Sequence, residues 1–491
     1  MNVLLLSTYE LGHQPLAVAR PAAHLAAAGH RVRCQDLAVE RLDEALVREA
    51  ALVGLSVPMH TATRLAVRLA ERVRALNPAC HICFYGLYAS LHADVLLGRL
   101  ADSVVGGEFE APLVQLADGL SGREALPING VLTLDHPGGV FLGRQAFAVP
   151  RRDLLPPLDR YARVDTGSKQ KLVGYVEASR GCAHQCLHCP ITPVYGGRLR
   201  IVPAEVVLAD IRQLVAMGAQ HITFGDPDFF NGIRHSLRLV EAMHAEFPAL
   251  TFDATIKIEH LLEHRQHLPA LAAAGCLFVV SAVEAVQDHI LANFQKGHTA
   301  ADVEVALGLA AAAGIALRPT FVPFTPWTSL QDYRELLAFV ERHGLIRHVD
   351  PIQFAIRLLV PRGSSLVGTP AMAPYLGPFD EATFSYRWAH PDPRLDRLQE
   401  AASAVVEQAA GRNEDAVVTF ARLRALVEAA VAGEALATPA RSNGPLAAAV
   451  AAPLGSTACL SAELGDAAVA AALARAAVLP PVPRLTEAWF C

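Results

Sequence analysis

The 491-residue sequence lacks the features of two large protein classes. It has no clustered run of lysine and arginine, and its formal net charge is −6, so we expect no nucleic-acid-binding surface. Charged residues make up only 18% of the chain against 52% hydrophobic residues, which excludes an intrinsically disordered protein. A chain of this length and composition predicts a globular protein of about two or three domains.

The sequence also lacks an apolar segment long enough to cross a membrane. Its longest apolar stretch, residues 268–283, contains Gly275 and is shorter than a bilayer requires. The first residues, Met1–Leu6, carry no basic leader and favour a buried β-strand over a signal peptide. We therefore expect a cytoplasmic protein without a membrane partner.

Cysteine is scarce, and its distribution does not suit a disulfide framework. The nine cysteines are odd in number, and three of them lie together in Cys182-Ala-His-Gln-Cys186-Leu-His-Cys189. Reduced thiols with one metal site fit this pattern better than disulfides. Three thiolates supply one ligand fewer than an iron–sulfur cube or a tetrahedral zinc ion needs. The open position makes this run a candidate catalytic site.

Strand and helix patterns alternate along residues 1–125. Helical patterns at Pro15–Ala28 and Thr61–Leu76 lie between short apolar runs typical of buried strands, at Val3–Leu6, Arg31–Cys34, Ala51–Val57, His81–Tyr85 and Val104–Val105. This alternation predicts a parallel sheet covered by helices. Ligands of such sheets bind beyond the carboxyl ends of the strands, in the loops Tyr9–Gln14, Pro58–His60, Gly86–Tyr88 and Gly106–Glu110.

Residues 126–170 carry the turn signals of a linker, and residues 171–370 alternate again. We predict strands at Gly174–Ala178, His221–Phe224, Thr251–Ala254, Leu277–Ser281, Leu317–Val322 and Pro351–Arg357. Helices are predicted at Ala204–Met217, His235–Glu246, Leu268–Ala274, Ala300–Ala313 and Leu330–His343. About six strand–helix units make a partial or full α/β barrel, in which function collects at the strand carboxyl ends.

The composition of the sequence changes near residue 371 and again near residue 431. Residues 371–430 combine aromatic residues with a helical pattern at Arg394–Ala410 and predict a helical C-terminal region. Residues 431–491 are rich in alanine and proline and predict a flexible tail that ends in Cys491.

The spacing Cys-x3-Cys-x2-Cys after the first strand of a strand–helix repeat resembles the radical S-adenosylmethionine (SAM) superfamily. The resemblance implies that Cys182, Cys186 and Cys189 ligate three irons of a [4Fe–4S] cluster, whose fourth iron binds the amino and carboxylate groups of SAM. An electron from the cluster then cleaves a carbon–sulfur bond of SAM. The alternative is a zinc site that uses His184 or His188, although zinc motifs usually come as paired hooks.

The same resemblance assigns roles to five further residues. Gly225 and Asp226 resemble the segment that contacts the methionine amino group, and Glu284 resembles a glutamate of the cobalamin-associated branch that holds the amino group or ribose. Arg357 would meet the carboxylate, and His188 stands where the family has an aromatic residue beside adenine. The alternatives are helix-capping carboxylates for Asp226 and Glu284 and a structural ion pair for Arg357.

Residues 1–125 resemble the cobalamin-binding domain that precedes many radical enzymes. The Asp-x-His-x-x-Gly signature that supplies an axial histidine is absent, and only His13 and His60 lie at suitable predicted strand ends. Binding without a histidine, or a domain that binds no corrinoid, are the alternatives.

A narrower resemblance covers nearly the whole chain. Segments such as Lys257-Ile-Glu-His260 and Lys296-Gly-His-Thr299 resemble a group of radical SAM proteins named for its tail, Cys-Sec-Ala-Glu-Pro or Cys-Cys-Ala-Glu-Pro (CUAEP/CCAEP). Because this sequence stops at Cys491, we hypothesise that a UGA codon follows and that the protein is a truncated selenoprotein. Cys491 would then be a catalytic soft nucleophile, whereas the alternative is a frayed terminal thiol.

These observations predict an α/β fold with five parts. A Rossmann-like, cobalamin-binding-type domain (1–125) and a linker (126–170) precede a partial radical SAM barrel (171–370), a helical region (371–430) and a tail (431–491). We expect reductive cleavage of SAM and radical C–H functionalisation or methyl transfer on a small-molecule substrate, with electrons from a low-potential donor such as flavodoxin or ferredoxin. The alternatives are transfer of the 3-amino-3-carboxypropyl group to a soft acceptor such as arsenic, and a non-enzymatic redox or corrinoid-binding sensor.

Overall fold

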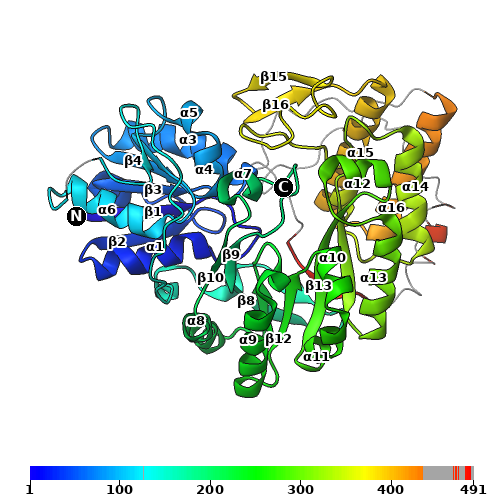
Figure 1. Cartoon of the computed structure of the whole chain (residues 1–491), viewed down its shortest axis with the longest axis horizontal. Coiled ribbons are helices and arrows are strands. Elements are labelled where there is room, and N and C mark those ends of the chain that lie inside the picture. Colours follow the sequence, from blue (N-terminus) through cyan, green and yellow to red (C-terminus); the bar gives the residue numbers. More distant parts are fainter. Residues whose placement is uncertain (125–126, 435–467, 469, 473, 475–480, 488–491) are drawn as a thin grey trace.

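The computed structural model describes residues 1–124, 127–434, 468, 470–472, 474 and 481–487. Two sheets of mainly parallel strands, each flanked by helices, lie side by side (Figure 1). The expected α/β fold class is confirmed, with a curled partial barrel and a helical C-terminal part. Along the described residues, no helix has the length and apolar character needed to cross a membrane.

The first sheet has the strand order β2-β1-β3-β4-β5-β6. Its strands are β1 (Asn2–Ser7), β2 (Arg31–Asp36), β3 (Leu52–Ser56), β4 (His81–Tyr85), β5 (Ser103–Val105) and the antiparallel β6 (Val131–Leu132). All five strands predicted in residues 1–125 are present. In this order β2 lies on one side of β1, and β3, β4 and β5 lie on the other, so the order in which strands are added reverses between β1 and β3. Ligands of open α/β sheets bind at such a switch point.

Helices cover both faces of this sheet, because successive side chains of a strand point to opposite faces. Leu4 and Leu6 of β1 pack toward α3 (His60–Leu76), and Val3 and Leu5 pack toward α1 (Leu16–Ala27) and α6 (Glu110–Leu120). The shorter helices of this unit are α2 (Glu44–Glu49), α4 (Leu87–Leu91) and α5 (Ala93–Leu96).

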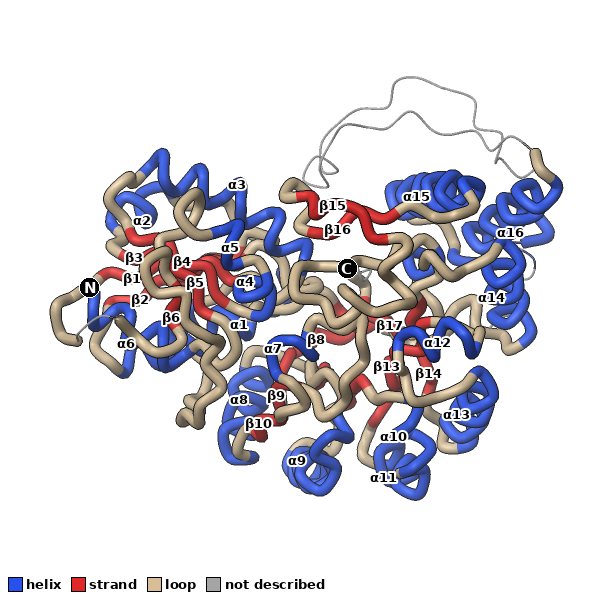
Figure 2. Tube along the Cα trace, turned by 45° about the horizontal axis from the view of Figure 1, so that its top comes forward, coloured by secondary structure: helices blue, strands red, loops and turns tan. Residues whose placement is uncertain are grey.

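The second sheet is the partial barrel, with the order β14-β13-β12-β11-β8-β7-β17. Among the described residues, its parallel strands are β8 (Gln170–Val176), β11 (His221–Phe224), β12 (Thr251–Thr255), β13 (Cys276–Glu284) and β14 (Ala316–Phe321). The antiparallel β7 (Arg163–Asp165) and β17 (Arg484–Leu485) extend one edge. In the tube view this curled sheet lies beside the first sheet (Figure 2).

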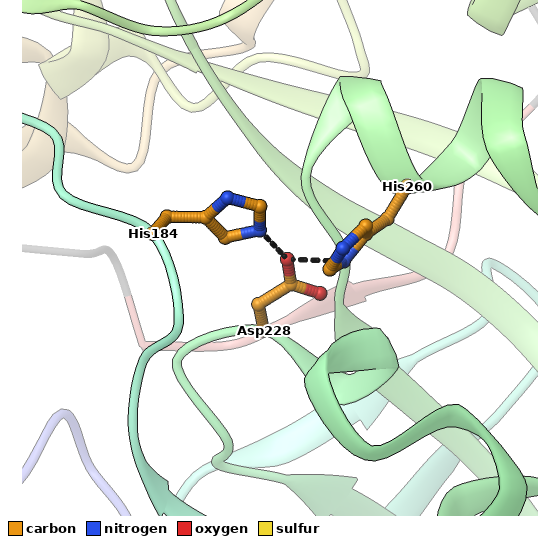
Figure 3. A group of neighbouring side chains, drawn as sticks. All are labelled: His184, Asp228 and His260. Carbon is orange, nitrogen blue, oxygen red and sulfur yellow. Dashed lines mark hydrogen bonds and ion pairs between the residues drawn. The ribbon is translucent and has the colours of Figure 1, made fainter. Parts of the chain in front are cut away.

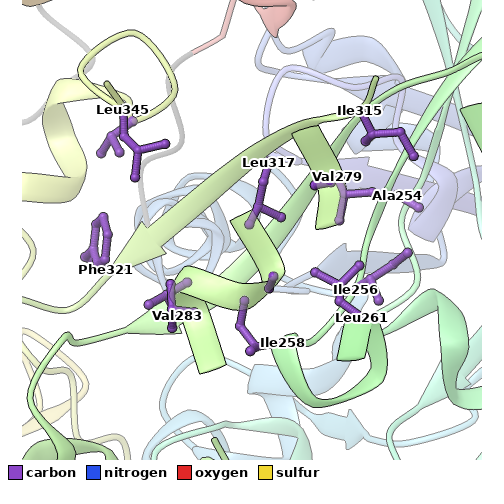
Figure 4. Packing of buried hydrophobic residues seen from close by; sticks show 14 of the residues in the cluster. Ala254, Ile256, Ile258, Leu261, Val279, Val283, Ile315, Leu317, Phe321 and Leu345 are labelled. Atoms are coloured by element: carbon purple, nitrogen blue, oxygen red, sulfur yellow. The ribbon is translucent and has the colours of Figure 1, made fainter. Parts of the chain in front are cut away.

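Helices cover the outer face of the partial barrel. They are α8 (Ala204–Ala216), α9 (Ile233–Glu246), α10 (Ile258–Glu263), α11 (Leu268–Ala273), α13 (Ala300–Ala312) and α14 (Leu330–Arg342). Helix α12 (Asp288–Phe294) lies instead at the barrel mouth, where the Leu187 N–H donates to the Phe294 carbonyl at 3.0 Å. Figure 4 shows part of the core, where Val279 and Leu317 from neighbouring strands pack near Ile258 and Leu261 of α10. This layer of apolar side chains fixes the strand ends that carry the site.

The predicted sixth barrel strand, Pro351–Arg357, is wrong. Residues Pro351–Phe354 form a 3₁₀ turn, and only an isolated bridge joins Arg357 to Phe324. Proline favours the first position of a helical turn because it has no backbone N–H to donate to a strand ladder. The hydroxyl of Tyr333 donates to the Phe354 carbonyl at 2.9 Å and holds the turn in place.

The C-terminal part packs beside α14. It comprises the hairpin β15 (Leu376–Asp380) and β16 (Ser385–Trp388), followed by α15 (Pro393–Arg412) and α16 (Ala416–Ala432). The segment predicted as a linker, residues 126–170, contributes β6 to the first sheet and β7 to the second. Of the predicted tail, residues 481–487 add β17 to the edge of the barrel, beside β7.

Candidate active site

The three clustered cysteines lie in one loop at the barrel mouth. This loop runs from β9 (Ser179–Gly181) to α7 (Ile191–Tyr195), just after β8; the partner of β9 is β10 (Leu199–Ile201). Gly181 has φ +73°, and a Cβ there would lie 2.2 Å from the Arg198 carbonyl oxygen. Only glycine fits at this position, so the turn that delivers Cys182 depends on it.

The donor set suits an iron–sulfur cube better than zinc. The sulfurs of Cys182, Cys186 and Cys189 do not all lie within 4.8 Å of one another. Thiolates on one tetrahedral zinc ion, with Zn–S bonds of about 2.3 Å, would lie about 3.8 Å apart. Burial raises the pKa of the Cys189 thiol to about 12, so its thiolate needs the positive charge of a bound metal.

The two histidines of the motif point to other partners. His184 Nε2 lies 3.1 Å from Asp228 Oδ2, and His188 Nε2 lies 3.1 Å from Glu284 Oε1. The ring of His188 packs 4.4 Å from that of Phe294. The Nε2 atoms of both histidines therefore lie against carboxylates, whereas His188 Nδ1 has no hydrogen-bond partner among the described residues.

Glu284 lies at the end of β13, where it faces the cysteine loop. Its Oε1 accepts from His188 and from Lys296 Nζ, at 3.1 and 3.3 Å. Burial alone would raise its pKa, but the Lys296 charge and His188 lower the pKa of Glu284 to about 2. Its backbone is in the left-handed region, with φ +70°, a strain that side chains tolerate mainly at functional positions.

Asp226 and Gly225 lie at the end of β11, behind the cysteine loop. Asp226 accepts from the Ser179 hydroxyl at 2.5 Å and from the Ala178 N–H at 2.9 Å, and burial raises its pKa to about 7. A Cβ at Gly225 would lie 2.0 Å from the hydroxyl oxygen of Tyr175. In this structure both residues hold the backbone that leads into the cysteine motif.

Arg357 makes its contacts with the C-terminal part of the chain. The Arg357 guanidinium donates to Asp396 and to the Trp388 carbonyl, both at 2.7 Å, and lies 3.5 Å from the centre of the Trp388 ring. These contacts tie η5 (Pro351–Phe354) to the C-terminal hairpin and α15. Cys491 lies outside the described residues.

The histidines considered as cobalt ligands are both buried. His13 stacks on Tyr175 at 4.6 Å between ring centres, and burial lowers its pKa to about 4. His60 begins α3, and its Nε2 lies 2.6 Å from the Thr383 carbonyl oxygen. Both rings therefore have contacts with the barrel or the C-terminal hairpin.

A buried ion cluster joins the first sheet to the cysteine loop. Arg180, two residues before Cys182, donates to Glu110 at 2.5 and 2.9 Å and to Glu108 at 3.0 Å. All three side chains are at most 5% exposed. The predicted ligand loop Gly106–Glu110 thus lies directly against the cysteine motif.

Sequence reasoning missed a group of side chains on the far side of the loop. Figure 3 shows the rings of His184 and His260 on either side of the Asp228 carboxylate. Lys257 Nζ lies 3.2 Å from His184 Nδ1. Asp228 and Lys257 follow β11 and β12, so their position after predicted strands was the signal that could have found them.

One cavity lies away from these residues. It has a volume of about 430 Å³ between β17, α15 and α16, and its lining includes Arg347, Asp350 and Arg484. No residue of the cysteine motif lines it. We assign the chemistry to the cysteine loop because the strained and charge-paired groups gather there.

Comparison with known proteins finds a family model that matches part of the chain. Residues 176–340 match the Radical SAM superfamily. Hopanoid C-3 methylase of Methylococcus capsulatus is 26% identical over 325 residues, which cover 64% of this chain and 62% of the methylase. The ribosomal protein uS12 methylthiotransferase RimO of Nitratiruptor sp. is 26% identical over 189 residues, 36% of this chain and 42% of that enzyme. The chain thus spans less than two thirds of either relative.

Two solved structures share the fold. The cobalamin-dependent SAM radical enzyme OxsB, with aqua-cobalamin bound, has a TM-score of 0.69 at 16% identity and matches 87% of this chain and 71% of its own. The radical SAM methyltransferase TsrM of Kitasatospora setae, with tryptophan and a SAM analogue bound, has a TM-score of 0.57 at 21% identity over 70% of this chain and 71% of its own. At these identities the likeness shows the fold alone.

Proposed function

Because the chain is a radical SAM enzyme by its match over residues 176–340, we propose that it transfers a methyl group to, or functionalises a C–H bond of, a small-molecule substrate. A radical SAM domain uses a [4Fe–4S] cluster and SAM, and we assign the cluster to Cys182, Cys186 and Cys189. When bound, the cluster supplies the electron that cleaves SAM, and a cobalamin would supply a methyl carrier. The single observation that carries the proposal is the loop of three cysteines at the barrel mouth, against the first sheet.

The chain's own residues would prepare this site in three ways. Glu284 and Lys296 place a buried ion pair beside the loop, where Glu284 would orient the amino group or ribose of SAM. Asp226 and Gly225 hold the backbone before Cys182, and Arg180 fixes the loop to Glu108 and Glu110. His188 would contact adenine, and Arg357 would act from a distance by fixing the C-terminal hairpin. A low-potential donor such as flavodoxin or ferredoxin would supply the electron.

The first sheet offers a place for cobalamin at its switch point. Glu10, in the loop after β1, is buried, and its Oε2 has no hydrogen-bond partner among the described residues. Burial raises the pKa of Glu10 to about 8. The amide side chains of a corrinoid would supply the missing donors, and a corrinoid in this position would face the cysteine loop. The methylase relative and the cobalamin-bound neighbour support this proposal.

A second candidate reaction is the transfer of the 3-amino-3-carboxypropyl group of SAM to a soft acceptor such as arsenic, which would suit a tail that carries the thiol of Cys491. One observation favours it. The described residue Glu487 lies against the loop after β1, where the Tyr9 hydroxyl donates to its Oε1 at 3.5 Å. Cys491 follows Glu487 by four residues in the sequence. The CUAEP/CCAEP assignment belongs to this proposal, and the codons that follow Cys491 test it.

Product analysis distinguishes the candidates. We expect anaerobically reconstituted protein with a strong reductant to contain about four irons per chain and to release 5′-deoxyadenosine or S-adenosylhomocysteine from SAM. Methylthioadenosine instead would indicate 3-amino-3-carboxypropyl transfer, and no cleavage product would indicate a sensor. Cys182→Ala should lose the cluster's iron, sulfide and visible absorbance, whereas Cys34→Ala, in β2, should retain them.

A further inference from the structure

We propose that His184, Asp228 and His260 bind a divalent transition-metal ion beside the cysteine loop. This second metal would be separate from the metal that the three cysteines hold. The three residues come from three segments that meet at the barrel mouth: the cysteine loop, the loop after β11, and α10. Binding of this ion does not depend on the reaction proposed above.

The distances suit a shared ion. Asp228 Oδ2 lies 3.1 Å from His184 Nε2 and 2.8 Å from His260 Nδ1, and the ligand atoms of the three residues lie within 4.8 Å of one another. Ligands on one ion, with bonds of about 2.0–2.2 Å, lie about 3 Å apart. Small adjustments of the two rings in Figure 3 would therefore bring all three atoms onto an ion.

One carboxylate oxygen serves both rings. Asp228 Oδ2 pairs with His260 Nδ1 at 2.8 Å and with His184 Nε2 at 3.1 Å, and the contact to His260 Nδ1 does not have hydrogen-bond geometry. A metal ion among these three atoms would replace the two contacts by direct bonds.

The surroundings are those of a metal ligand set. The Phe230 N–H donates to Asp228 Oδ1 at 3.1 Å, which orients the carboxylate and leaves Oδ2 facing the two rings. Glu259 Oε2 lies 3.8 Å from His184 Nδ1 and 2.7 Å from Lys257 Nζ. Lys257 Nζ lies closer to the same ring nitrogen, at 3.2 Å. When an ion takes Nε2 of His184, the ring proton moves to Nδ1, and Lys257 must turn away from it toward Glu259, to which it already donates at 2.7 Å.

The donor types indicate which ions fit. Two imidazoles and one carboxylate bind Zn²⁺ or Fe²⁺ and leave coordination positions open for another ligand. The side chain of Asp228 is 2% exposed, whereas those of His184 and His260 are 16% and 14% exposed. The open positions would therefore face the barrel mouth and could hold an anionic or soft group of a substrate.

Zinc binding to the reconstituted holoprotein tests the proposal. After reconstitution with iron and sulfide and removal of loosely bound metal, Zn²⁺ is added, and zinc and iron are measured per chain. We expect about one zinc per chain in addition to the cluster iron. His260→Gln and Asp228→Asn should each weaken zinc binding by at least about 100-fold in competition with a chelator, since they remove a direct ligand. His289→Gln, the same change at an exposed histidine, should have no effect.

Three results would overturn the proposal. One is a wild-type protein that binds no zinc above the level of the two variants, when the variants keep their cluster iron and their circular dichroism. Another is zinc lost in His264→Gln but kept in Asp228→Asn, which would place the ion on His260, Glu263 and His264 instead. The third is a zinc–sulfur distance of about 2.3 Å in X-ray absorption, since we expect only nitrogen and oxygen ligands at about 2.0–2.2 Å.

Discussion

The Nε2 atom of His188 lies 3.1 Å from Oε1 of Glu284, although 96 residues separate them in the chain. One residue stands inside the cysteine motif, and the other ends β13 with a strained backbone. Lys296 completes the contact at 3.3 Å from the same oxygen. The contact connects the cysteine loop to β13. It also places the Glu284–Lys296 ion pair beside the residues that we assign to the cluster.

Replacing Glu284 by glutamine should change both SAM binding and the cluster. The variant leaves Lys296 as a buried cation without its carboxylate, so the surroundings of the cluster become more positive. We expect a higher reduction potential, because added positive charge favours the reduced cluster. SAM cleavage should fall at least about tenfold, as for a lost interaction of about 1.4 kcal/mol. Redox titration by electron paramagnetic resonance and product release measure the two effects.

The matched control for Glu284 is Glu304→Gln, on the exposed face of α13, which should leave both quantities unchanged. An unaltered reduction potential together with unaltered SAM cleavage in Glu284→Gln would contradict a role at the cluster.

Replacing Gly181 by alanine should prevent cluster assembly. The new Cβ would lie 2.2 Å from the Arg198 carbonyl in a conformation with φ +73°, so the turn before Cys182 must move. Gly196→Ala is the matched control, because its φ is also positive but its Cβ would meet no neighbour. The control should lose about 1 kcal/mol of stability and keep its iron, whereas Gly181→Ala should lose iron. Equal iron content in the two proteins would refute the expectation.

Replacing Arg180 by methionine should destabilise the contact between the two sheets. The change leaves Glu108 and Glu110 buried without their main cation, and breaking a buried pair on one side costs about 3–5 kcal/mol. Chemical denaturation of the apoprotein measures the loss. Arg212→Met removes an exposed pair with Glu246 and should cost little stability, because solvent screens exposed charges. A loss in Arg180→Met no larger than this would show that the ion cluster does not stabilise the fold.

Glu10 should make the protein less stable as the pH rises. Its pKa is about 8 in the folded protein, against 4.5 for an ordinary glutamate, so between these values the folded state binds the extra proton. Stability therefore falls from about pH 4.5 to about pH 8 and levels off above it. Glu10→Gln should abolish this part of the dependence, worth a few kcal/mol at the order of magnitude. Parallel pH profiles of the two proteins would contradict the raised pKa.

Local patterns in the sequence predicted most of the secondary structure. Apolar runs located β1 to β5 of the first sheet and five parallel strands of the barrel, because a strand buried on both faces is mostly apolar. They did not locate β6, which lies in the segment predicted as a linker. The same reasoning failed at Pro351–Phe354, where an apolar run with a proline forms a 3₁₀ turn. The apolar side chains of this turn pack in the core, as those of a buried strand would. Hydrophobicity alone therefore did not distinguish the turn from a strand.

The sequence by itself determined the cysteine loop, because three ligands within eight residues need no folding to be neighbours. Only the tertiary structure brought His188 to Glu284 and Lys296, and His184 to Asp228 and His260. Their proximity arises because parallel strands end at one edge of the sheet, which gathers loops that are far apart in the chain. The spacing of residues in the sequence shows which residues are neighbours along the chain. It does not show which residues come together only when the chain folds.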